Sequence, residues 1–570
     1  MVMLKYPCSI CMYGADLQIS QMLLQVDGLP KALSTISHSH PQNLFNLLER
    51  CNSIRKLTQI HTQILVNGFT KKNFLLVKLL FYYVYSGYLE PALTVFENVE
   101  KPSTGIWNQI IRGYGRSETP GKSVELYNRM VETEAKPDGY TYSFLLNACA
   151  KSGLFREGEQ VHGRVFANGY CSNLFVQTNL VNFYAVGGGG NRVECARRAF
   201  DDMPERNVVS WNSLLKGYVK CGDIDGARRI FSEMPERNVV SWTTMVAGCA
   251  QNGKSRESLS LFQRMRRADM ELDQVALVSA LSACAVLGDL ELGRWIHWGI
   301  EEASRVKNQP FLVSLNNALI HMYASCGVID EAYEVFKKMP KRNTVSWTTI
   351  ISGFAKQGRG DEALHVFWTM LSSGKREERP DEITFIGALC ACSHGGLVNE
   401  GRHIFKFMTQ TMGISPRIEH YGCMVDLLSR AGFLDEAMRL IETIPMKLND
   451  AIWGALLGGC RLHKNAELAS NIAKKLSVEL NSDQAAGYLV LLSNVYAAAE
   501  RWLDVAFVRQ KMVQMGVKKP PGRSWIQIDG IIHDFVAGDM THRHASSIYK
   551  MLDEIYKMNS RDMPLYAEEY

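Results

Sequence analysis

The sequence has no apolar stretch long enough to cross a membrane as a helix. Its richest apolar run, residues 74–85, is interrupted by Lys78, whereas a membrane-spanning helix needs about 20 apolar residues. The chain also lacks a strong excess of charge, because 63 Lys and Arg face 58 Asp and Glu. An excess this small does not by itself indicate nucleic-acid binding. Any such function has to be sought in the arrangement of the residues.

The 14 cysteines lack the arrangement of a disulfide framework. Cys149, Cys284 and Cys392 occupy equivalent places in NACAKSG, SACAVLG and CACSHGG, and Cys221 and Cys326 form a second equivalent pair. Placement that repeats in this way predicts small packing residues in a reducing compartment.

Metal-site spacing is missing as well. Cys8 and Cys11 form a single CxxC with no second pair at zinc spacing, so we interpret them as incidental. His542 and His544 lie near each other in the sequence, but a surface loop explains them better than a metal site. We therefore expect no metal and no cofactor.

What the chain does have is a repeated phrase, a tryptophan followed by Asn or Thr and an apolar run. The copies are WNQIIRGYGRSE, WNSLLKGYVKCG, WTTMVAGCAQNG and WTTIISGFAKQG, which begin at Trp107, Trp211, Trp242 and Trp347. The connecting segments repeat too, as MPERN at 203–207 and 234–238 and MPKRN at 339–343. Self-similarity with a spacing of about 30 to 35 residues indicates stacked helical hairpins.

Each unit has the pattern of two helices. In EALHVFWTM the apolar residues fall on one helical face, and Asp361 and Glu362 suit the positive start of that helix. Pro137 and Pro380 close their units, since proline ends a preceding helix. We expect an all-α fold, a right-handed α-solenoid superhelix of helix-turn-helix repeats. Such an array also accommodates 570 residues without one oversized core.

These features resemble the pentatricopeptide repeat family, in the plant subclass that mixes standard, long and short repeats. The resemblance covers about residues 43–540. It divides 43–450 into about twelve repeats, with an inserted GGGGN near 187–191. The predicted repeats are 43–73, 74–103, 104–138, 139–173, 174–207, 208–238, 239–273, 274–312, 313–343, 344–381, 382–417 and 418–450. The alternative repeat family is the tetratricopeptide type, which has a fixed period of 34 residues. The predicted repeats 208–238 and 239–273 differ in length, which argues against that family.

In the family, the fifth and the last residue of a repeat together read one base of single-stranded RNA. Asn and Thr can donate to and accept from the edge of a base, and neighbouring repeats can sandwich that base. The resemblance implies that each of six pairs reads one base. Asn108 with Asp138 would read uracil, and Thr178 with Asn207 would read adenine. Asn212 with Asn238 and Asn317 with Asn343 would read pyrimidines, and Thr243 with Asp273 and Thr348 with Asp381 would read guanine.

Other repeats carry pairs that the family code does not read. They are Lys78 with Ser103, Ser143 with Asn173, Val278 with Leu312, and Ile386 with Arg417. Because protein and RNA run parallel in this family, the expected target is U-x-A-Y-G-x-Y-G-x-x from 5′ to 3′, where Y is a pyrimidine.

A simpler interpretation of these polar residues is also open. Asn or Thr in an early helical turn is often only a capping or hydrogen-bonding residue. We favour RNA recognition because six repeats carry matched partners at their far ends. We expect the tryptophans to pack between hairpins, and we leave open whether Arg112 and Lys216 contact phosphate.

The segments after the repeats resemble the E region of plant organellar RNA-editing factors. AIWGALLGGCRLHKNAELA at 451–469 begins this region, which we place at 451–519. PPGRSWIQIDGIIHDFVAGD at 520–539 resembles the family's extension, with Arg523 where many members carry Cys. The chain departs from the pattern after about residue 556, so we interpret 520–570 as a truncated extension.

A deaminase signature is missing from this sequence. A zinc deaminase needs His-x-Glu and Cys-x-x-Cys to hold its metal and move protons. No histidine is followed two residues later by Glu, and no CxxC follows the repeats. We therefore expect that the chain is not an enzyme.

The resemblance implies a sequence-specific RNA-binding protein that selects sites for C-to-U editing in a plant organelle. A DYW-type deaminase would act in trans, together with editing accessory proteins. We expect no membrane among the partners. The alternatives are a splicing, stability or translation factor for organellar RNA, or a protein-interaction scaffold. We expect a mitochondrial location, with the chloroplast as the alternative. Residues 1–42 could be a transit peptide, although the segment has no Arg, which such peptides usually carry.

Overall fold

The computed structural model describes residues 40–187, 190–307, 312–479, 482–514, 522–528, 531–536 and 538–561. It divides the chain into two compact units, Met1–Asp223 and Ile224–Tyr570. Cys8, Cys11 and nearly all of the N-terminal segment lie outside the described residues. Each unit is described by itself.

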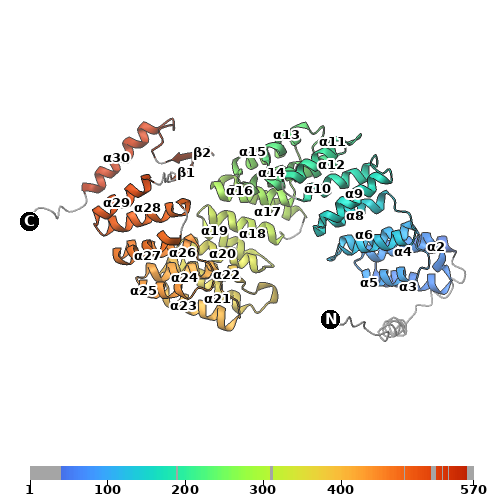
Figure 1. Cartoon of the computed structure of the whole chain (residues 1–570), viewed down its shortest axis with the longest axis horizontal. Coiled ribbons are helices and arrows are strands. Elements are labelled where there is room, and N and C mark those ends of the chain that lie inside the picture. Colours follow the sequence, from blue (N-terminus) through green and yellow to red (C-terminus); the bar gives the residue numbers. More distant parts are fainter. Residues whose placement is uncertain are drawn as a thin grey trace, which may run out of the picture. The chain divides into compact units, whose positions relative to one another are not determined.

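The first unit is a row of helical hairpins (Figure 1). Its helices are α2 (Pro41–Glu49), α3 (Ile54–Val66), α4 (Asn73–Tyr85), α5 (Leu89–Glu97), α6 (Thr104–Arg116), α7 (Lys122–Glu132), α8 (Gly139–Ser152), α9 (Phe155–Ala167), α10 (Leu174–Val186), α11 (Gly190–Asp201) and α12 (Val208–Cys221).

The second unit continues with the same kind of hairpin. Its helices are α13 (Ile224–Glu233), α14 (Val239–Gln251), α15 (Ser255–Arg267), α16 (Gln274–Leu287), α17 (Leu290–Lys307), α18 (Val313–Ser325), α19 (Ile329–Lys338), α20 (Thr344–Lys356), α21 (Gly360–Ser372), α22 (Glu382–Gly395), α23 (Val398–Lys406), α24 (Ile418–Arg430), α25 (Leu434–Glu442), α26 (Asp450–Leu462), α27 (Ala466–Glu479), α28 (Ser482–Ala498), α29 (Trp502–Gln514) and α30 (Ala545–Arg561).

The even-numbered helices from α2 to α28, called A helices below, form one layer within each unit. Each packs against the next A helix of its unit, as α6 packs on α4 and α8, and α20 packs on α18 and α22. The odd-numbered helices from α3 to α29, called B helices, pack on the A helices beside them. The predicted all-α repeat fold is confirmed.

A two-stranded antiparallel hairpin follows the helical hairpins. Strand β1 (Arg523–Ile528) pairs with β2 (Ile531–Val536), and Ile528 stands opposite Ile531. Only Asp529 and Gly530 separate the strands, a dipeptide that favours two-residue hairpin turns. The all-α prediction includes no strands in this segment. No described helix is long and apolar enough to cross a membrane.

The repeated MPERN and MPKRN segments close the B helices of their repeats. Their arginines donate from Nε and Nη2 to the last carbonyl groups of the preceding helix, which lack partners within that helix. Each guanidinium also lies near the ring of a phenylalanine. The contacts are Arg206 to Phe200 O at 3.1 Å and Asp201 O at 3.0 Å, Arg237 to Phe231 O and Ser232 O at 2.8 Å each, and Arg342 to Phe336 O at 3.1 Å and Lys337 O at 2.9 Å.

The cysteines that repeat along the chain lie where packing residues were expected. Cys149, Cys284 and Cys392 are buried, and Cys221 and Cys326 are half-buried. Burial raises the pKa of Cys149 to about 11 and that of Cys392 to about 12. These thiols are therefore protonated and unreactive at neutral pH.

Three long repeats share a histidine–tyrosine contact between a B helix and the next A helix. His61 Nδ1 lies 3.1 Å from Tyr83 Oη, His162 Nδ1 lies 2.9 Å from Tyr184 Oη, and His297 Nδ1 lies 2.8 Å from Tyr323 Oη. Burial is the main cause that lowers the pKa of each of these histidines below 6.5.

These histidines should make the fold sensitive to acid. The unfolded chain takes up protons near pH 6.5, before the folded chain does, so the stability is full above that pH and is lost as the pH falls through the folded pKa values. We expect the melting temperature to fall by several degrees between pH 7.5 and pH 5. Replacing His61, His162 and His297 together by Gln should flatten this dependence. An unchanged slope in the triple variant would contradict the assignment.

Candidate nucleic-acid interface

The predicted last-position residues all cap A helices. Each accepts a backbone N–H from the residue three positions later through its side-chain Oδ1. The N–H···Oδ1 distances are 2.9 Å for Thr141 to Asp138, 2.8 Å for Ser210 to Asn207, 3.1 Å for Ser241 to Asn238, 2.8 Å for Ala276 to Asp273, 3.0 Å for Ser346 to Asn343 and 2.9 Å for Thr384 to Asp381. The sequence analysis considered helix capping as a simpler role for the Asn and Thr residues in the early helical turns. The structure shows capping at the last residue of the repeat and not at the fifth.

Capping and base recognition are compatible at these positions. The cap bond uses Oδ1, and an Asp or Asn side chain carries a second polar atom, Oδ2 or Nδ2, on the same rigid group. Because the cap fixes the side chain against the helix start, that second atom has a defined direction. Such pre-orientation favours recognition of one ligand edge over another.

Two of the predicted pairs are joined directly. Asn108 Nδ2 donates to Asp138 Oδ1 at 3.0 Å, and Asn317 Nδ2 donates to Asn343 Oδ1 at 3.3 Å. Asn108 also accepts from the Thr141 hydroxyl at 2.7 Å. The fifth residue and the last residue of these repeats are thus adjacent in space, although they are 30 and 26 positions apart.

The pair of Thr348 and Asp381 is joined through a third side chain. Thr348 Oγ1 lies 2.7 Å from Thr384 Oγ1, which donates to Asp381 Oδ1 at 2.7 Å. Both members of the pair line an open cavity of about 280 Å³. Other residues around it are Val345, Ile383, His321 and Lys356. The cavity combines apolar walls, hydroxyl groups, a carboxylate and an exposed cation, and groups of these kinds can contact the face and edge of a base and a phosphate.

The threonines of two other pairs have different surroundings. Thr178 Oγ1 donates to Leu174 O at 2.7 Å within its own helix. Thr243 Oγ1 is buried and has no hydrogen-bond partner among the described residues. Asn212 belongs to the first unit and Asn238 to the second.

A row of exposed apolar side chains was missed in the sequence. The second residue of many repeats is large, apolar and more than half exposed, three positions before the predicted fifth-position contact. These residues and their exposed fractions are Tyr140 60%, Phe175 64%, Val209 59%, Val240 53%, Val275 54%, Val345 55% and Ile383 58%. The recurring valine before Ser-Trp in VVSWN, VVSWT and TVSWT was the available signal. The row offers apolar surface to the flat faces of bases.

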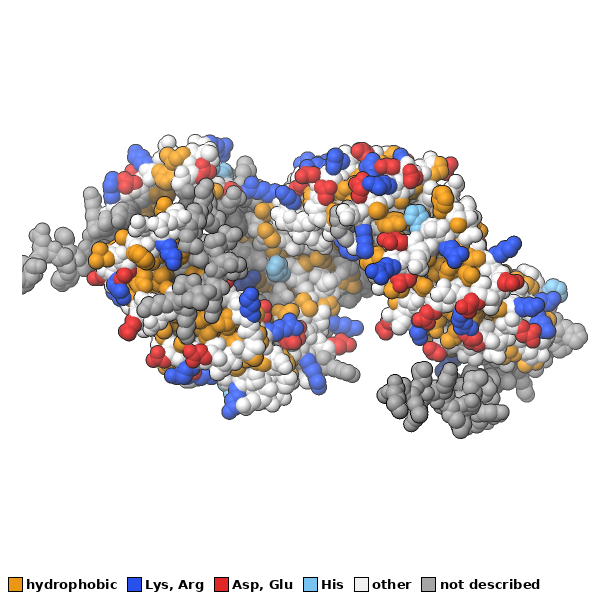
Figure 2. All heavy atoms as spheres, in the orientation of Figure 1, with side chains coloured by type: hydrophobic (Ala, Val, Ile, Leu, Met, Phe, Trp, Pro, Cys, Tyr) orange, Lys and Arg blue, Asp and Glu red, His pale blue; other side chains and the backbone are white. Residues whose placement is uncertain are grey.

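The cations on the A helices have different roles. Lys151 Nζ donates at 2.9 Å to the carbonyl groups of Arg116 and Ser117, at the end of the preceding A helix. Lys220 does the same to Val186 O at 2.5 Å. Lys216 is exposed. Figure 2 shows basic and acidic side chains intermixed on the visible face, in keeping with the small net charge.

The tryptophans before the fifth residues pack between hairpins, as predicted. Each meets the ring of a phenylalanine of the preceding B helix edge to face. The ring centroids are 4.7 Å apart for Phe96 and Trp107, 4.6 Å for Phe200 and Trp211, 4.9 Å for Phe231 and Trp242, and 4.8 Å for Phe336 and Trp347.

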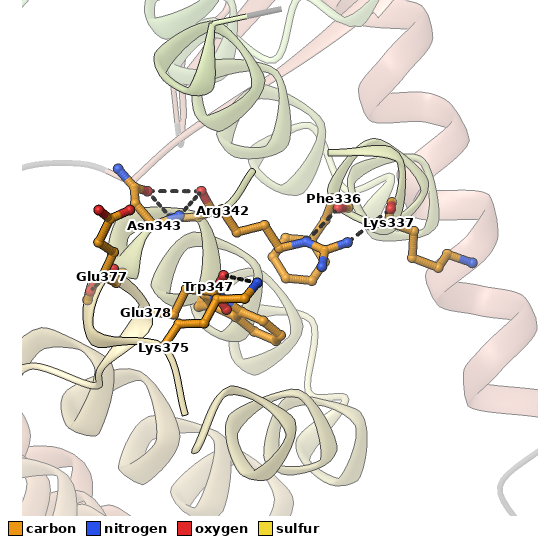
Figure 3. Close-up of polar contacts among 10 residues, drawn as sticks. Phe336, Lys337, Arg342, Asn343, Trp347, Lys375, Glu377 and Glu378 are labelled. Carbon is orange, nitrogen blue, oxygen red and sulfur yellow. Dashed lines mark hydrogen bonds and ion pairs between the residues drawn. The ribbon is translucent and has the colours of Figure 1, made fainter. Parts of the chain in front are cut away.

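Trp347 also holds the segment that leads to Asp381 (Figure 3). Its Nε1 donates at 3.1 Å to Glu378, which is only 4% exposed and also accepts from Lys375 Nζ at 2.9 Å. Burial alone would raise the pKa of Glu378, but the bonds from Lys375 and Trp347 help to hold it below its usual range. The equivalent Nε1 of Trp107 is buried with no partner among the described residues.

These two tryptophans form a matched pair for mutation. We expect Trp347→Phe to destabilise the protein by about 1–3 kcal/mol more than Trp107→Phe, because only the first change takes a hydrogen bond from a buried carboxylate. Chemical unfolding of the two variants measures the difference. Equal losses would show that the Trp347–Glu378 bond contributes nothing.

No metal site is found in the part of the chain that the structure describes. His542 Nε2 lies 2.9 Å from His533 Nδ1, so this histidine interacts with another ring.

Family models match about half of the chain, in several stretches. The PPR repeat family matches residues 102–151 and 206–239, and the PPR repeat matches 140–173, 240–270, 317–344, 345–374 and 419–446. The E motif matches residues 463–527.

Known proteins match over nearly the whole chain. A chloroplastic/mitochondrial pentatricopeptide repeat-containing protein of Arabidopsis thaliana is 36% identical over 529 residues, which cover 91% of this chain and 77% of the relative. A second Arabidopsis thaliana pentatricopeptide repeat-containing protein is 41% identical over 518 residues, covering 90% and 82%. The crystal structure of maize PPR10, a pentatricopeptide repeat protein, has a similar fold, with a TM-score of 0.51, 15% identity and 89% of each chain covered.

Proposed function

The chain belongs to the pentatricopeptide repeat family, and from this premise we propose that it binds a specific single-stranded RNA in a plant organelle. The row of fifth and last residues reads one base per repeat. By binding there, the chain specifies where a cytidine is converted to uridine by a deaminase that acts in trans.

The observation that carries the RNA-binding proposal is the adjacency of fifth and last residues in three pairs, Asn108 with Asp138, Asn317 with Asn343 and, through Thr384, Thr348 with Asp381. In six repeats the last residue, an Asp or Asn, caps the start of the next A helix. The fifth residue lies about one turn from the start of the repeat's own A helix. At Thr348 and Asp381 an open cavity adjoins the pair. A site that supplies both donors and acceptors can distinguish base edges, because a wrong base leaves buried polar groups without partners.

The chemistry differs between the pairs in a way that supports different bases. Beyond its bonds to Asp138 and Thr141, Asn108 keeps a second amide hydrogen on Nδ2 and a second lone pair on Oδ1. Thr348 offers one hydroxyl beside Asp381, whose carboxylate can accept from a donor-rich base edge such as that of guanine. The proposed target is U-x-A-Y-G-x-Y-G-x-x.

The editing role is supported by the E motif match at 463–527. The region after the repeats would recruit a DYW-type deaminase and editing accessory proteins, which supply the catalysis. We propose a mitochondrial location, with the chloroplast as the alternative. The name of one relative, which includes both organelles, supports an organellar location.

Sequencing organellar cDNA against genomic DNA in a loss-of-function line tests this function. We expect C-to-U conversion to be lost at one or a few sites, each preceded by a match to U-x-A-Y-G-x-Y-G. Complete editing at every site would overturn the editing role. Altered splicing or abundance of one transcript would then identify an organellar RNA factor of another kind, and no RNA phenotype would favour a protein scaffold.

A further inference from the structure

Two cysteine thiols meet between neighbouring A helices of the second unit. Cys390 lies on α22 and Cys423 on α24, and these helices pack side by side (Figure 1). The two Sγ atoms are 3.3 Å apart, so one thiol hydrogen-bonds to the other. Both residues are half-buried, so neither thiol is sealed inside the core.

This pair is distinct from the cysteines that pack the repeats. Cys149, Cys284 and Cys392 are each the eleventh residue of a predicted repeat, and all three are buried. Cys390 is the ninth residue of its repeat, and Cys423 is the sixth residue of the next one. The packing role that explains the repeating cysteines therefore does not explain these two.

The ninth residue of a repeat meets the sixth residue of the next repeat elsewhere in the chain as well. In the third and fourth predicted repeats, the Arg112 guanidinium lies 5.7 Å from the ring centre of Phe144. In the fourth and fifth, Asn147 Nδ2 donates to Asn179 Oδ1 at 2.5 Å. The contact between the two thiols thus follows from the way in which successive A helices pack, and not from one side-chain rotamer.

The surroundings of Cys390 favour its thiolate. A hydrogen bond from the Cys423 thiol lowers the pKa of Cys390 below its ordinary value, although burial opposes this effect. A positive charge on His394, one turn further along α22, also favours the thiolate, whereas Asp426 disfavours it. Asp426 is paired with Arg430 at 2.8 Å, so part of its charge is compensated.

Cys423 has the opposite character. The same contact with Cys390, followed by burial, raises the pKa of Cys423. Its Sγ also lies 4.0 Å from the backbone oxygen of Ile386, one turn before Cys390 on α22. Cys423 therefore keeps its proton and is held against the turn that carries the more reactive thiol.

We propose that Cys390 and Cys423 form an oxidation site, at which hydrogen peroxide produces a reversible disulfide between the last two predicted repeats. This inference does not depend on RNA binding. Cysteine pairs that oxidise in a reducing compartment are usually transient and redox-sensing, which agrees with the reducing compartment expected for this chain.

The reaction consumes one hydrogen peroxide and releases two waters. The Cys390 thiolate attacks one peroxide oxygen and the O–O bond breaks, which leaves a sulfenic acid on Cys390. The other oxygen leaves as hydroxide and takes up the proton that Cys390 released. The Cys423 sulfur then attacks the Cys390 sulfur, the S–O bond breaks and the S–S bond forms. The departing hydroxyl takes the Cys423 proton and leaves as the second water.

The distance between the thiols is short enough for this bond to form. A disulfide has an S–S length of about 2.05 Å, so the sulfurs must approach each other by about 1.2 Å. Both side chains are half-buried, and side-chain rotation with a slight approach of the two helices provides this movement. A dithiol reductant reverses the reaction by thiol–disulfide exchange.

The disulfide would act as a lock on one junction of the repeat array. It closes a loop between residues 33 positions apart, which restricts the unfolded chain. Because each repeat contacts only its neighbours, the lock fixes α22 against α24. The start of α22 is capped by Asp381, so the locked helix is also one that carries a predicted base-reading residue.

Peptide mapping of the purified full chain tests the site. The reduced protein is treated with hydrogen peroxide, its remaining thiols are alkylated, and it is digested with trypsin. We expect a disulfide between the peptide that contains Cys390 and the peptide 418–430, which contains Cys423, and we expect dithiothreitol to remove it. Cys390 shares its peptide with Cys392, so Cys392→Ala must keep the disulfide and Cys390→Ser must abolish it.

Two single variants test the order of the steps. Cys423→Ser should stop the reaction at the sulfenic acid of Cys390, which dimedone traps. Cys390→Ser should leave Cys423 unmodified by the same peroxide treatment. Cys221→Ser is the matched control, because Cys221 is half-buried and its thiol donates to Tyr218 O at 3.2 Å. This variant should form the Cys390–Cys423 disulfide as the wild-type protein does.

Thermal unfolding gives a second readout. Oxidised wild-type protein should melt several degrees above the reduced protein, and dithiothreitol should reverse the shift. Cys390→Ser and Cys423→Ser should lack the shift, while their melting temperatures in reductant, close to that of the wild type, show that they fold. A disulfide from either cysteine to a third cysteine or to another chain would overturn the proposal. So would a sulfenic acid trapped on Cys423 instead of Cys390, or peroxide treatment that leaves both thiols free.

Discussion

Replacing Thr348 by Asn should move the base preference of its repeat from guanine to uracil. The variant would place Asn opposite Asp381, the combination that Asn108 and Asp138 already form. In that natural pair the amide donates to the carboxylate at 3.0 Å. The open cavity beside Thr348 leaves room for the larger side chain.

The size of the change follows from the number of hydrogen bonds exchanged. A well-placed pair of bonds to a base contributes about 1–3 kcal/mol of discrimination. We therefore expect affinity for RNA with guanine at nucleotide 8 to fall about tenfold, and affinity for RNA with uracil there to rise about tenfold. Fluorescence anisotropy with the four possible RNAs measures both changes.

Thr369→Asn is the matched control for this prediction. Thr369 lies on the neighbouring α21, is exposed, and donates to the backbone of its own helix at 2.7 Å. The same substitution there should leave all four affinities unchanged. If Thr348→Asn also keeps its preference for guanine, Thr348 does not read that base.

Replacing Asp273 by Asn should change guanine to adenine at nucleotide 5. Asp273 caps α16 through Oδ1, which accepts from Ala276 N at 2.8 Å, and Asn caps helices about as well as Asp. The helix start is therefore kept while the carboxylate becomes an amide. The new pair, Thr243 with Asn, matches the natural combination of Thr178 with Asn207.

We expect the preference between guanine and adenine at nucleotide 5 to reverse, with a change of about tenfold for each base. The melting temperature should hardly change. Asp289→Asn provides the control, because Asp289 caps the B helix α17 through Leu292 N at 3.1 Å, away from the base-reading row. A loss of stability without a change of base preference would show that Asp273 serves only as a cap.

The repeated phrases predicted the fold well, because each recurs at positions that packing requires. The tryptophans pack edge to face on phenylalanines of the preceding helix, and the arginines of MPERN close that helix. Helix packing of this kind depends on neighbours within about one repeat, so it is visible in the local sequence.

Features that depend on exposure or on distant partners could not be predicted. The exposed valines looked like ordinary core residues, because an apolar residue in an amphipathic helix is usually buried. The bond between Trp347 and Glu378 joins residues 31 positions apart, and the equivalent Trp107 has no such partner among the described residues. Lys151 and Lys220 bond to the ends of preceding A helices, at carbonyl groups 35 and 34 positions away in the sequence.

The polar pairs lie between these cases. The family resemblance identified twelve residues, and the structure places six of them as helix caps and joins Asn108 to Asp138 and Asn317 to Asn343. Their contact with RNA remains a prediction, as does the readout of Thr178, Asn212 and Thr243.

Selection from a pool of random RNA with the purified full chain tests the central claim most directly. After several rounds the account predicts enrichment of U-x-A-Y-G-x-Y-G in that order, with guanine at nucleotides 5 and 8 and free variation at nucleotide 2. Enrichment of an unrelated sequence, or of none, would contradict the assignment of one base to each polar pair.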